Sequence, residues 1–114
     1  MKLTTERKNG VLVLLPRGRI DHQTSDKLRE ALMSHIEGQK GTIQLVVRFA
    51  GVDYINSEGL QVLLFVSQRL ARMKGRLLLC EMNEHIRAVF KISGLDRVLP
   101  VTETEADALK RSHQ

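Results

Sequence analysis

Val52-Asp53-Tyr54-Ile55-Asn56-Ser57-Glu58-Gly59-Leu60 links an apolar, strand-like run to the longest helical pattern in the chain, residues 57–74. Asn56 and Ser57 suit a helix N-cap because their side-chain oxygens can accept hydrogen bonds from free helix amides. Gly59 lies in the first turn, where glycine is about 1 kcal/mol less favourable than alanine. A glycine at this position indicates that another group approaches the backbone closely, either a packed neighbour or a partner protein.

Short strands and helices alternate on both sides of this stretch. Asn9-Gly10 is a strong hairpin signal because both positions tolerate positive φ. The expected elements are strands at 3–7 and 11–15, the second closed by Pro16; a helix at 25–37 ended by Gly38 and Gly41; a strand at 42–49; the helix at 57–74 stopped by Gly75; a strand at 76–80; a helix capped by Asn83 and ended by Gly94; a strand at 98–101; and a terminal helix after a Thr102–Glu105 capping box.

This alternation requires crossover connections, which predicts a largely parallel sheet. We expect an α/β fold in which a mixed sheet of four or five strands, with an N-terminal hairpin, packs with about four helices. At 114 residues and 42% hydrophobic content, the chain has the size and composition of a single globular domain, residues 1–114.

The composition favours a soluble, cytoplasmic protein. Cys80 is the one cysteine, so no disulfide can form within the chain, which fits a reducing compartment. Residues 1–8 lack the apolar core of a signal peptide. The longest apolar runs, 11–15 and 62–66, fall far short of the roughly 20 residues that cross a bilayer. We therefore expect no membrane insertion.

The charge pattern and the missing motifs argue against nucleic-acid binding and catalysis. The net charge is +5, but the basic residues are scattered and only four aromatic residues are present, too few for stacking platforms. No glycine-rich phosphate loop or zinc-ligand spacing occurs. The four histidines lie far apart, and Asp21 and Asp53 are typical turn formers. We expect neither an enzyme nor a cofactor or metal site.

Three blocks of the sequence, taken together, carry a family resemblance. They are Gly18-Arg19-Ile20-Asp21-His22-Gln23-Thr24, Asn56-Ser57-Glu58-Gly59-Leu60 and Val89-Phe90-Lys91-Ile92-Ser93-Gly94-Leu95-Asp96. In order, they resemble the Gly-x-Leu-Asp-x-x-Thr loop, the Asp-Ser-Ser-Gly-Leu signature and the third-helix ending of the STAS-domain anti-sigma factor antagonists. The resemblance covers nearly the whole chain and implies a STAS-like fold.

The resemblance also implies a partner switch. In this family the unmodified antagonist binds an anti-sigma factor that is also a serine kinase, and a sigma factor is released. The kinase then phosphorylates the signature serine, and a PP2C-type phosphatase removes the phosphate. Ser57 occupies the phosphoacceptor position of this sequence. The kinase would supply ATP and magnesium, so the chain would need no cofactor of its own.

Electrostatics supports such a switch at a helix N-terminus. A phosphate adds about −1.5 to −2 charges, which the free amides and the positive end of the helix dipole can accommodate. A partner surface pressed over the same point would bury an unpaired charge, at about 3–5 kcal/mol. That is a loss of about two to four decades in affinity. From residue chemistry alone, Ser57 could instead serve only as a helix cap.

The expected contact surface consists of Asp21, Asn56, Glu58 and Gly59, with Val62 and Val66 added if the second apolar face of the helix is exposed. A helix that is apolar on two sides is otherwise sandwiched within the protein.

Two residues depart from the family signature: Asn56 replaces an aspartate, and Glu58 replaces a small residue. Glu58 could mimic a phosphate, mark a partner with a basic patch, or act as a favourable first-turn acid.

Two other functions fit the same sequence. The chain could be a constitutive STAS adaptor subunit of a membrane transporter. It could also be a small-molecule or nucleotide sensor that binds an anion at the Ser57 end of the helix. Constitutive binding to a transport ATPase, or thermal stabilisation by nucleotides, would distinguish these functions from the partner switch.

Overall fold

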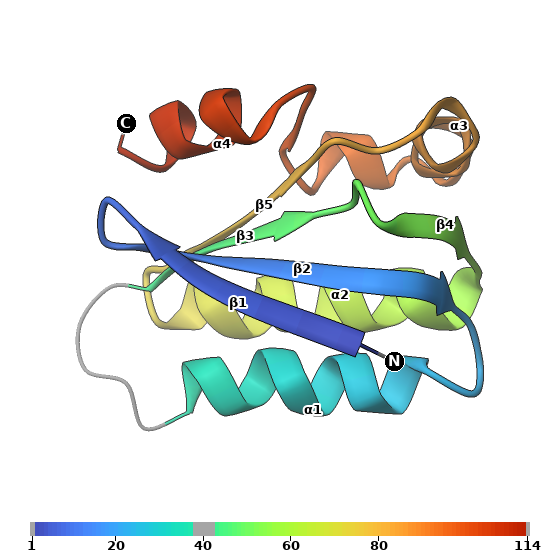
Figure 1. Ribbon diagram of the computed structural model, residues 1–114, viewed down its shortest axis with the longest axis horizontal. Coiled ribbons are helices and arrows are strands. Elements are labelled where there is room, and N and C mark those ends of the chain that lie inside the picture. The colour runs from blue at the N-terminus through green and yellow to red at the C-terminus, as the bar shows by residue number, and fades with distance from the viewer. Residues whose placement is uncertain (1, 38–42, 114) are drawn as a thin grey trace.

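The computed structural model describes residues 2–37 and 43–113, which form one mixed sheet with helices on both faces (Figure 1). The elements are β1 (Lys2–Lys8), β2 (Val11–Ile20), α1 (Ser25–Ile36), β3 (Gln44–Arg48), β4 (Val52–Ile55), α2 (Ser57–Arg72), β5 (Arg76–Cys80), α3 (Glu84–Ser93), a 3-10 turn (Leu95–Arg97), β6 (Val101–Thr102) and α4 (Glu105–Ser112).

The sheet has six strands, in the order β1-β2-β3-β5-β6, with β4 paired to β2. β1 and β2 form the expected antiparallel hairpin, whose turn residues Asn9 and Gly10 have φ of 52° and 79°. The other pairs are parallel. The sheet therefore has one strand more than the upper end of the expected four or five, because residues 52–55, which were not expected to form a strand, form β4.

β2 continues past Pro16, which was expected to end it. Residues 12–14 of β2 pair with β3, whereas residues 18–20 pair with β4. Pro16 lies between these two stretches, so its missing amide hydrogen removes no ladder bond to either partner. The extended strand carries the chain to Ile20, at the edge of the sheet where α2 begins.

The two faces of the sheet are covered unequally. α1 and α2 pack on one face and bury the larger core, which includes Leu14, Leu32 and Leu63. α4 covers the other face over a smaller cluster, in which Ala108 packs against β-strand residues such as Val13. No helix within residues 2–37 and 43–113 is both long and apolar enough to cross a membrane.

Most helix ends agree with the sequence. Asn83 caps α3 by accepting a 2.8 Å bond from the Ile86 amide, and Gly94 ends that helix with φ of 78°. Gly38 and Gly41, the expected end of α1, and the start of the expected strand at residue 42 lie outside the described residues.

The last strand and helix differ from the prediction. β6 spans Val101–Thr102 rather than residues 98–101, because the 3-10 turn at Leu95–Arg97 carries the chain further before it pairs with β5. The N-cap of α4 is Thr104, whose hydroxyl accepts a 3.0 Å bond from the Asp107 amide. Thr102 belongs to β6, so the Thr102–Glu105 capping box does not form.

Candidate functional site

The N-terminus of α2 lies at the end of the sheet where β2 and β4 finish. The Asn56 amide donates a 3.0 Å bond to the Ile20 carbonyl, which joins the loop after β2 to the start of α2. The Asn56 side chain accepts a 3.1 Å bond from the Gly59 amide. Asn56 is therefore the N-cap, and it satisfies one of the free amides of the first turn.

Ser57 is the first residue of α2, and its side chain is exposed. Because Asn56 provides the cap, the alternative that Ser57 serves only as the cap is wrong. Within residues 2–37 and 43–113, the Ser57 hydroxyl takes part in no hydrogen bond. The structure thus places a free hydroxyl at the positive end of a sixteen-residue helix.

Gly59 faces the interior rather than a partner. A Cβ at this position would lie 2.5 Å from Cγ2 of Ile20 and 2.7 Å from Cγ1 of Ile55. The close approach that the sequence indicated is confirmed, and the packed neighbours are the last residues of β2 and β4. Gly59 is buried, so it positions the Ser57 turn against the sheet and offers no surface for docking.

Asp21 is held at the same end of the sheet by a compact turn. Its carboxylate accepts a 2.9 Å bond from the Gln23 amide. The Thr24 hydroxyl accepts from the Asp21 amide and donates to the Arg19 carbonyl, at 2.9 and 2.7 Å. The Gln23 amide, followed by the hydrogen bond from Arg19, lowers the pKa of Asp21 below its ordinary value. A carboxylate is thus fixed directly after Ile20, the residue that bonds to Asn56.

Arg19 adds a positive charge that the sequence analysis did not single out. Its guanidinium lies 4.1 Å from the centre of the Tyr54 ring and 3.5 Å from the Asp21 carboxylate. The stacking partner comes from β4 and the acidic partner from the loop after β2. The contact depends on the parallel pairing of Arg19 with Tyr54, which could not be found without knowing that β4 is a strand.

Glu58 joins the first turns of two helices. The hydroxyl of Ser25, the first residue of α1, donates a long 3.5 Å bond to the Glu58 carboxylate. Ser25 is only 4% exposed, whereas Glu58 is exposed. The Glu58 side chain therefore reaches toward α1, an orientation that its place in the sequence did not reveal.

The expectation for the second apolar face of α2 is corrected. Val62 is 8% exposed and Val66 is fully buried, because both pack into the core between the sheet and α1. Val66 presents no face to a partner, and Val62 contributes only a small exposed area. Phe65 lies on the surface instead, with 49% exposure. The helical pattern grouped it with Val62 and Val66, and only the placement of α1 shows which of the three is left uncovered.

Together these residues define a small α/β domain with an open helix N-terminus on its surface. Asp21, Asn56, Ser57 and Glu58 meet at one end of the sheet, whereas Gly59, Val62 and Val66 lie beneath them. In the described residues, no group of three or more histidine, cysteine or acidic side chains is arranged to hold a metal ion. The arrangement places one exposed hydroxyl, that of Ser57, among polar side chains at this end of the sheet.

The chain belongs to the STAS domain family, whose model matches residues 2–108. BtrV of Bordetella bronchiseptica, provisionally named an anti-sigma factor antagonist, is 34% identical over 108 residues, which are 95% of this chain and 91% of BtrV. The crystal structure of an anti-sigma factor antagonist from Mycobacterium paratuberculosis is 25% identical, with a TM-score of 0.88 over 99% of this chain and 94% of that one.

A third protein shares the fold at lower identity. The anti-sigma factor antagonist SpoIIAA of Bacillus has been solved in an unphosphorylated form and in a phosphorylated form, both 23% identical to this chain. The TM-scores are 0.75 and 0.69, each over 96% of this chain and 95% or 98% of SpoIIAA. These matches confirm the STAS-like mixed α/β fold that the three sequence blocks implied.

Proposed function

We propose that this chain is an anti-sigma factor antagonist whose binding to its partner is controlled by phosphorylation of Ser57. The observation that carries the proposal is the exposed Ser57 hydroxyl, free of hydrogen bonds within the described residues and placed at the N-terminus of α2. In the unmodified chain, this end of the domain would bind the anti-sigma factor, which would then release its bound sigma factor. Phosphorylated, it would let the anti-sigma factor go.

The partner would be an anti-sigma factor that is also a serine kinase. The Ser57 Oγ would attack the γ-phosphorus of ATP, so that an O–P bond forms, the bond to ADP breaks and the hydroxyl proton passes to a base of the kinase. A PP2C-type phosphatase would hydrolyse the ester with water and restore the hydroxyl. The antagonist would contribute only the acceptor, the Ser57 hydroxyl, which has no hydrogen-bond partner among residues 2–37 and 43–113.

The local structure supports a switch that acts on binding rather than on folding. The Ser57 side chain lies outside the core, and Asn56 already caps the helix. A phosphate would therefore disturb no packed group, and the helix amides would stabilise its charge. Under a docked partner the same charge would be desolvated, at about 3–5 kcal/mol.

The names of relatives support the same role. BtrV is provisionally named an anti-sigma factor antagonist, the Mycobacterium paratuberculosis protein is named one without qualification, and SpoIIAA has been solved in a phosphorylated form. Asn56 and Glu58 are the two departures near the acceptor. Asn56 retains the cap through its side-chain oxygen, and the Glu58 carboxylate reaches the Ser25 hydroxyl. Neither departure blocks access to Ser57.

The decisive experiment is phosphorylation by an anti-sigma factor that has serine kinase activity. The purified chain is incubated with that kinase, magnesium and ATP, and the phosphate is located by mass spectrometry. We expect one phosphate on Ser57, none on Ser57→Ala, and unchanged modification of Ser93→Ala, which removes an exposed serine elsewhere. A kinase that binds the chain stably but leaves Ser57 unphosphorylated would contradict the switch. A failure of the anti-sigma factor to bind the unmodified chain would contradict the antagonist role.

A further inference from the structure

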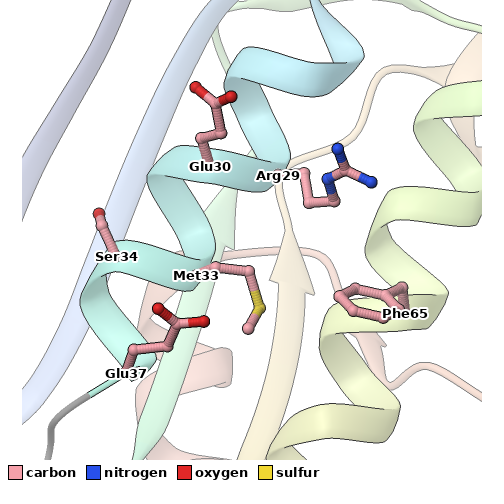
Figure 2. A pocket seen from close by; sticks show the side chains of 6 residues that line it. All are labelled: Arg29, Glu30, Met33, Ser34, Glu37 and Phe65. Atoms are coloured by element: carbon pink, nitrogen blue, oxygen red, sulfur yellow. The ribbon is translucent and has the colours of Figure 1, made fainter.

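A groove runs between α1 and α2 on the outer side of the molecule, beginning next to the Ser57 turn. One hollow of about 390 Å³ adjoins a second of about 270 Å³, and Arg29 and Phe65 line both. The first is lined by Arg29, Glu30, Met33, Ser34, Glu37 and Phe65, as Figure 2 shows. The second is lined by Ser25, Asp26, Arg29, Glu58, Gln61, Val62 and Phe65. We call the two hollows together the α1–α2 groove.

Phe65 is the apolar centre of this groove. It projects from α2 toward Met33 of α1 (Figure 2), and 49% of its surface is exposed. Two other large apolar residues in the described chain are more exposed, Ile92 at 88% and Val98 at 61%, and neither lines the groove. A half-buried aromatic ring between two helices is the type of anchor that dominates binding energy at protein interfaces.

The charge of the groove is opposite to that of the whole chain. Its lining carries four carboxylates, those of Asp26, Glu30, Glu37 and Glu58, against the single guanidinium of Arg29. The local charge is therefore −3, whereas the chain carries +5. Arg29 lies 3.4 Å from Asp26, so its charge is partly neutralised within the groove. An occupant with basic side chains would be attracted, and an acidic one repelled.

The dimensions match a short helix. From Ser25 to Glu37 the groove follows α1 and its C-cap over thirteen residues, and the twelve steps between them span about 18 Å at 1.5 Å per residue. A partner helix of about three turns can place one apolar face on Phe65 and Met33 while its basic flank meets the carboxylates along α1. On the α2 side, Arg69 and Arg72 line an adjoining hollow that Phe65 also lines. Glu58 lines the groove and directly follows Ser57, so a protein docked over Ser57 reaches the groove without a gap.

We propose that the α1–α2 groove binds a basic, amphipathic helix of the same partner that recognises Ser57. This inference rests on the proposed function in one respect, namely that the occupant belongs to the anti-sigma factor. The groove supplies a second contact that the Ser57 phosphate does not touch. The groove would therefore determine which partner is bound, whereas phosphorylation of Ser57 would determine when that partner is bound.

A designed peptide tests the groove without any anti-sigma factor. The probe is a fluorescein-labelled helix of about twelve residues, with leucines on one face and lysines on the other; a matched peptide carries glutamate in place of lysine. By fluorescence anisotropy we expect the lysine peptide to bind and the glutamate peptide not to bind. Phe65→Ala and Glu30→Lys should each weaken binding by at least about fivefold.

Two control variants match these changes outside the groove. Ile92→Ala removes an exposed apolar side chain from α3, and Glu103→Lys reverses an exposed charge before α4. Both should bind the lysine peptide like the unmodified chain. Equal binding of the two peptides, or binding that Phe65→Ala and Glu30→Lys leave unchanged, would overturn the proposal. A dimer of this chain that Phe65→Ala abolishes would assign the groove to a second copy and also overturn it.

The same variants then separate this inference from the proposed function. One outcome would refute the proposed role of the groove and leave the switch intact. In it, an anti-sigma factor binds the unmodified chain, does not bind Ser57→Asp, and binds Phe65→Ala and Glu30→Lys as well as the unmodified chain. If no anti-sigma factor binds while the lysine peptide requires Phe65 and Glu30, the antagonist role fails and the groove remains a docking site for a basic helix.

Discussion

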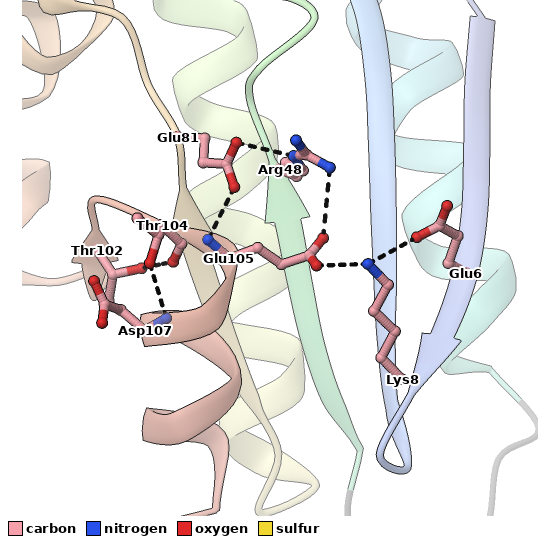
Figure 3. A network of polar contacts seen from close by, with 8 residues as sticks. All are labelled: Glu6, Lys8, Arg48, Glu81, Thr102, Thr104, Glu105 and Asp107. Atoms are coloured by element: carbon pink, nitrogen blue, oxygen red, sulfur yellow. Dashed lines mark hydrogen bonds and ion pairs between the residues drawn. The ribbon is translucent and has the colours of Figure 1, made fainter.

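The N-termini of α2 and α4 are built in opposite ways. At α4, the Glu81 carboxylate accepts a 2.9 Å bond from the Glu105 amide and a 3.0 Å bond from Arg48. The Glu105 carboxylate lies 2.6 Å from Lys8 and 3.9 Å from Arg48, which completes the network shown in Figure 3. At α2, the Asn56 side chain caps the helix, and the Ser57 hydroxyl next to it has no partner in the described residues.

This difference shows where the molecule can accept a new charge. At α4 the Glu105 amide and the Glu81 carboxylate are hydrogen-bonded, and Glu105 Oε2 is paired with Lys8. Glu105 Oε1 is buried without a hydrogen bond and lies 3.9 Å from Arg48. Glu81 has a φ of 58°, an unfavourable conformation for a residue other than glycine, and its two hydrogen bonds hold it there. The Glu81 carboxylate raises the pKa of Arg48, and Glu105 followed by Glu6 raises the pKa of Lys8. A phosphate would disrupt this network, whereas the α2 terminus is left open.

The largest expected effect tests the N-terminus of α2, where the Ser57 hydroxyl has no partner in the described residues. Ser57→Asp should weaken binding to the anti-sigma factor by about two to four decades, because a buried carboxylate without a partner costs about 3–5 kcal/mol. Its melting temperature should stay that of the unmodified chain. Titration calorimetry and thermal melts provide the two measurements. Ser57→Ala should bind normally, and a Ser57→Asp variant that binds equally well would show that the α2 end is not the switch.

The second effect tests the N-terminus of α4, where Glu81 accepts a hydrogen bond from the Glu105 amide. Glu81→Ala removes the bonds to Arg48 and to the Glu105 amide but keeps an unfavourable φ at the same position. We expect a loss of about 1–2 kcal/mol in the free energy of unfolding, with no change in partner binding. Urea unfolding measures it, and Glu103→Ala, an exposed acid nearby in sequence, is the control. A loss no larger than that of the control would mean that the network does not secure α4.

Cys80 provides an independent readout of the same network. The thiol is fully buried in the cluster that Ala108 of α4 covers, and burial raises its pKa to about 12. Labelling by a thiol reagent at about pH 8 should therefore be slow in the native chain. Glu81→Ala should accelerate it by loosening α4 and by removing a nearby negative charge that also raises the thiol pKa, whereas Ser57→Asp should not. Equal rates in all three chains would argue that α4 remains closed without Glu81.

A smaller effect tests the packing beneath Ser57. Gly59→Ala would place a methyl group 2.5 Å from Ile20 and 2.7 Å from Ile55. Overpacking of this kind costs about 1–3 kcal/mol, and the better helix propensity of alanine returns about 1 kcal/mol. We expect a net destabilisation of about 1 kcal/mol. Gly94→Ala, which changes a left-handed glycine with open space around it, separates packing from backbone conformation. A more stable Gly59→Ala would show that the neighbours yield easily.

The smallest effect concerns pH. Because the folded pKa of Asp21 is lowered from 3.8, its ionised form stabilises the fold above that value. This contribution is lost as the pH falls through the lowered pKa. Asp21→Asn should therefore melt at a lower temperature than the unmodified chain near neutral pH, and the difference should shrink below pH 3.8. Calorimetric melts across this range measure it, and a difference independent of pH would contradict the electrostatic cause.

The sequence alone predicted the features that depend on neighbouring residues. The hairpin at Asn9-Gly10, the Asn83 cap, the left-handed Gly94 and the start of α2 all follow from backbone preferences and caps, which act over a few residues. The close approach at Gly59 could also be inferred, because a glycine inside a helix is unfavourable unless something requires it. The family blocks then pointed to Ser57, and the structure places its side chain on the surface.

Tertiary structure decided the features that depend on which distant segments meet. Whether residues 52–55 form a strand depends on a partner in β2 beyond Pro16. The acceptor for the Glu105 amide at the start of α4 is Glu81, which follows β5 and is distant in sequence. The apolar pattern of α2 could not show that Val66 is covered while Phe65 is exposed, because α1 supplies the cover. Hydrophobic burial has no direction of its own, so only the packed arrangement determines which apolar side chains remain for a partner.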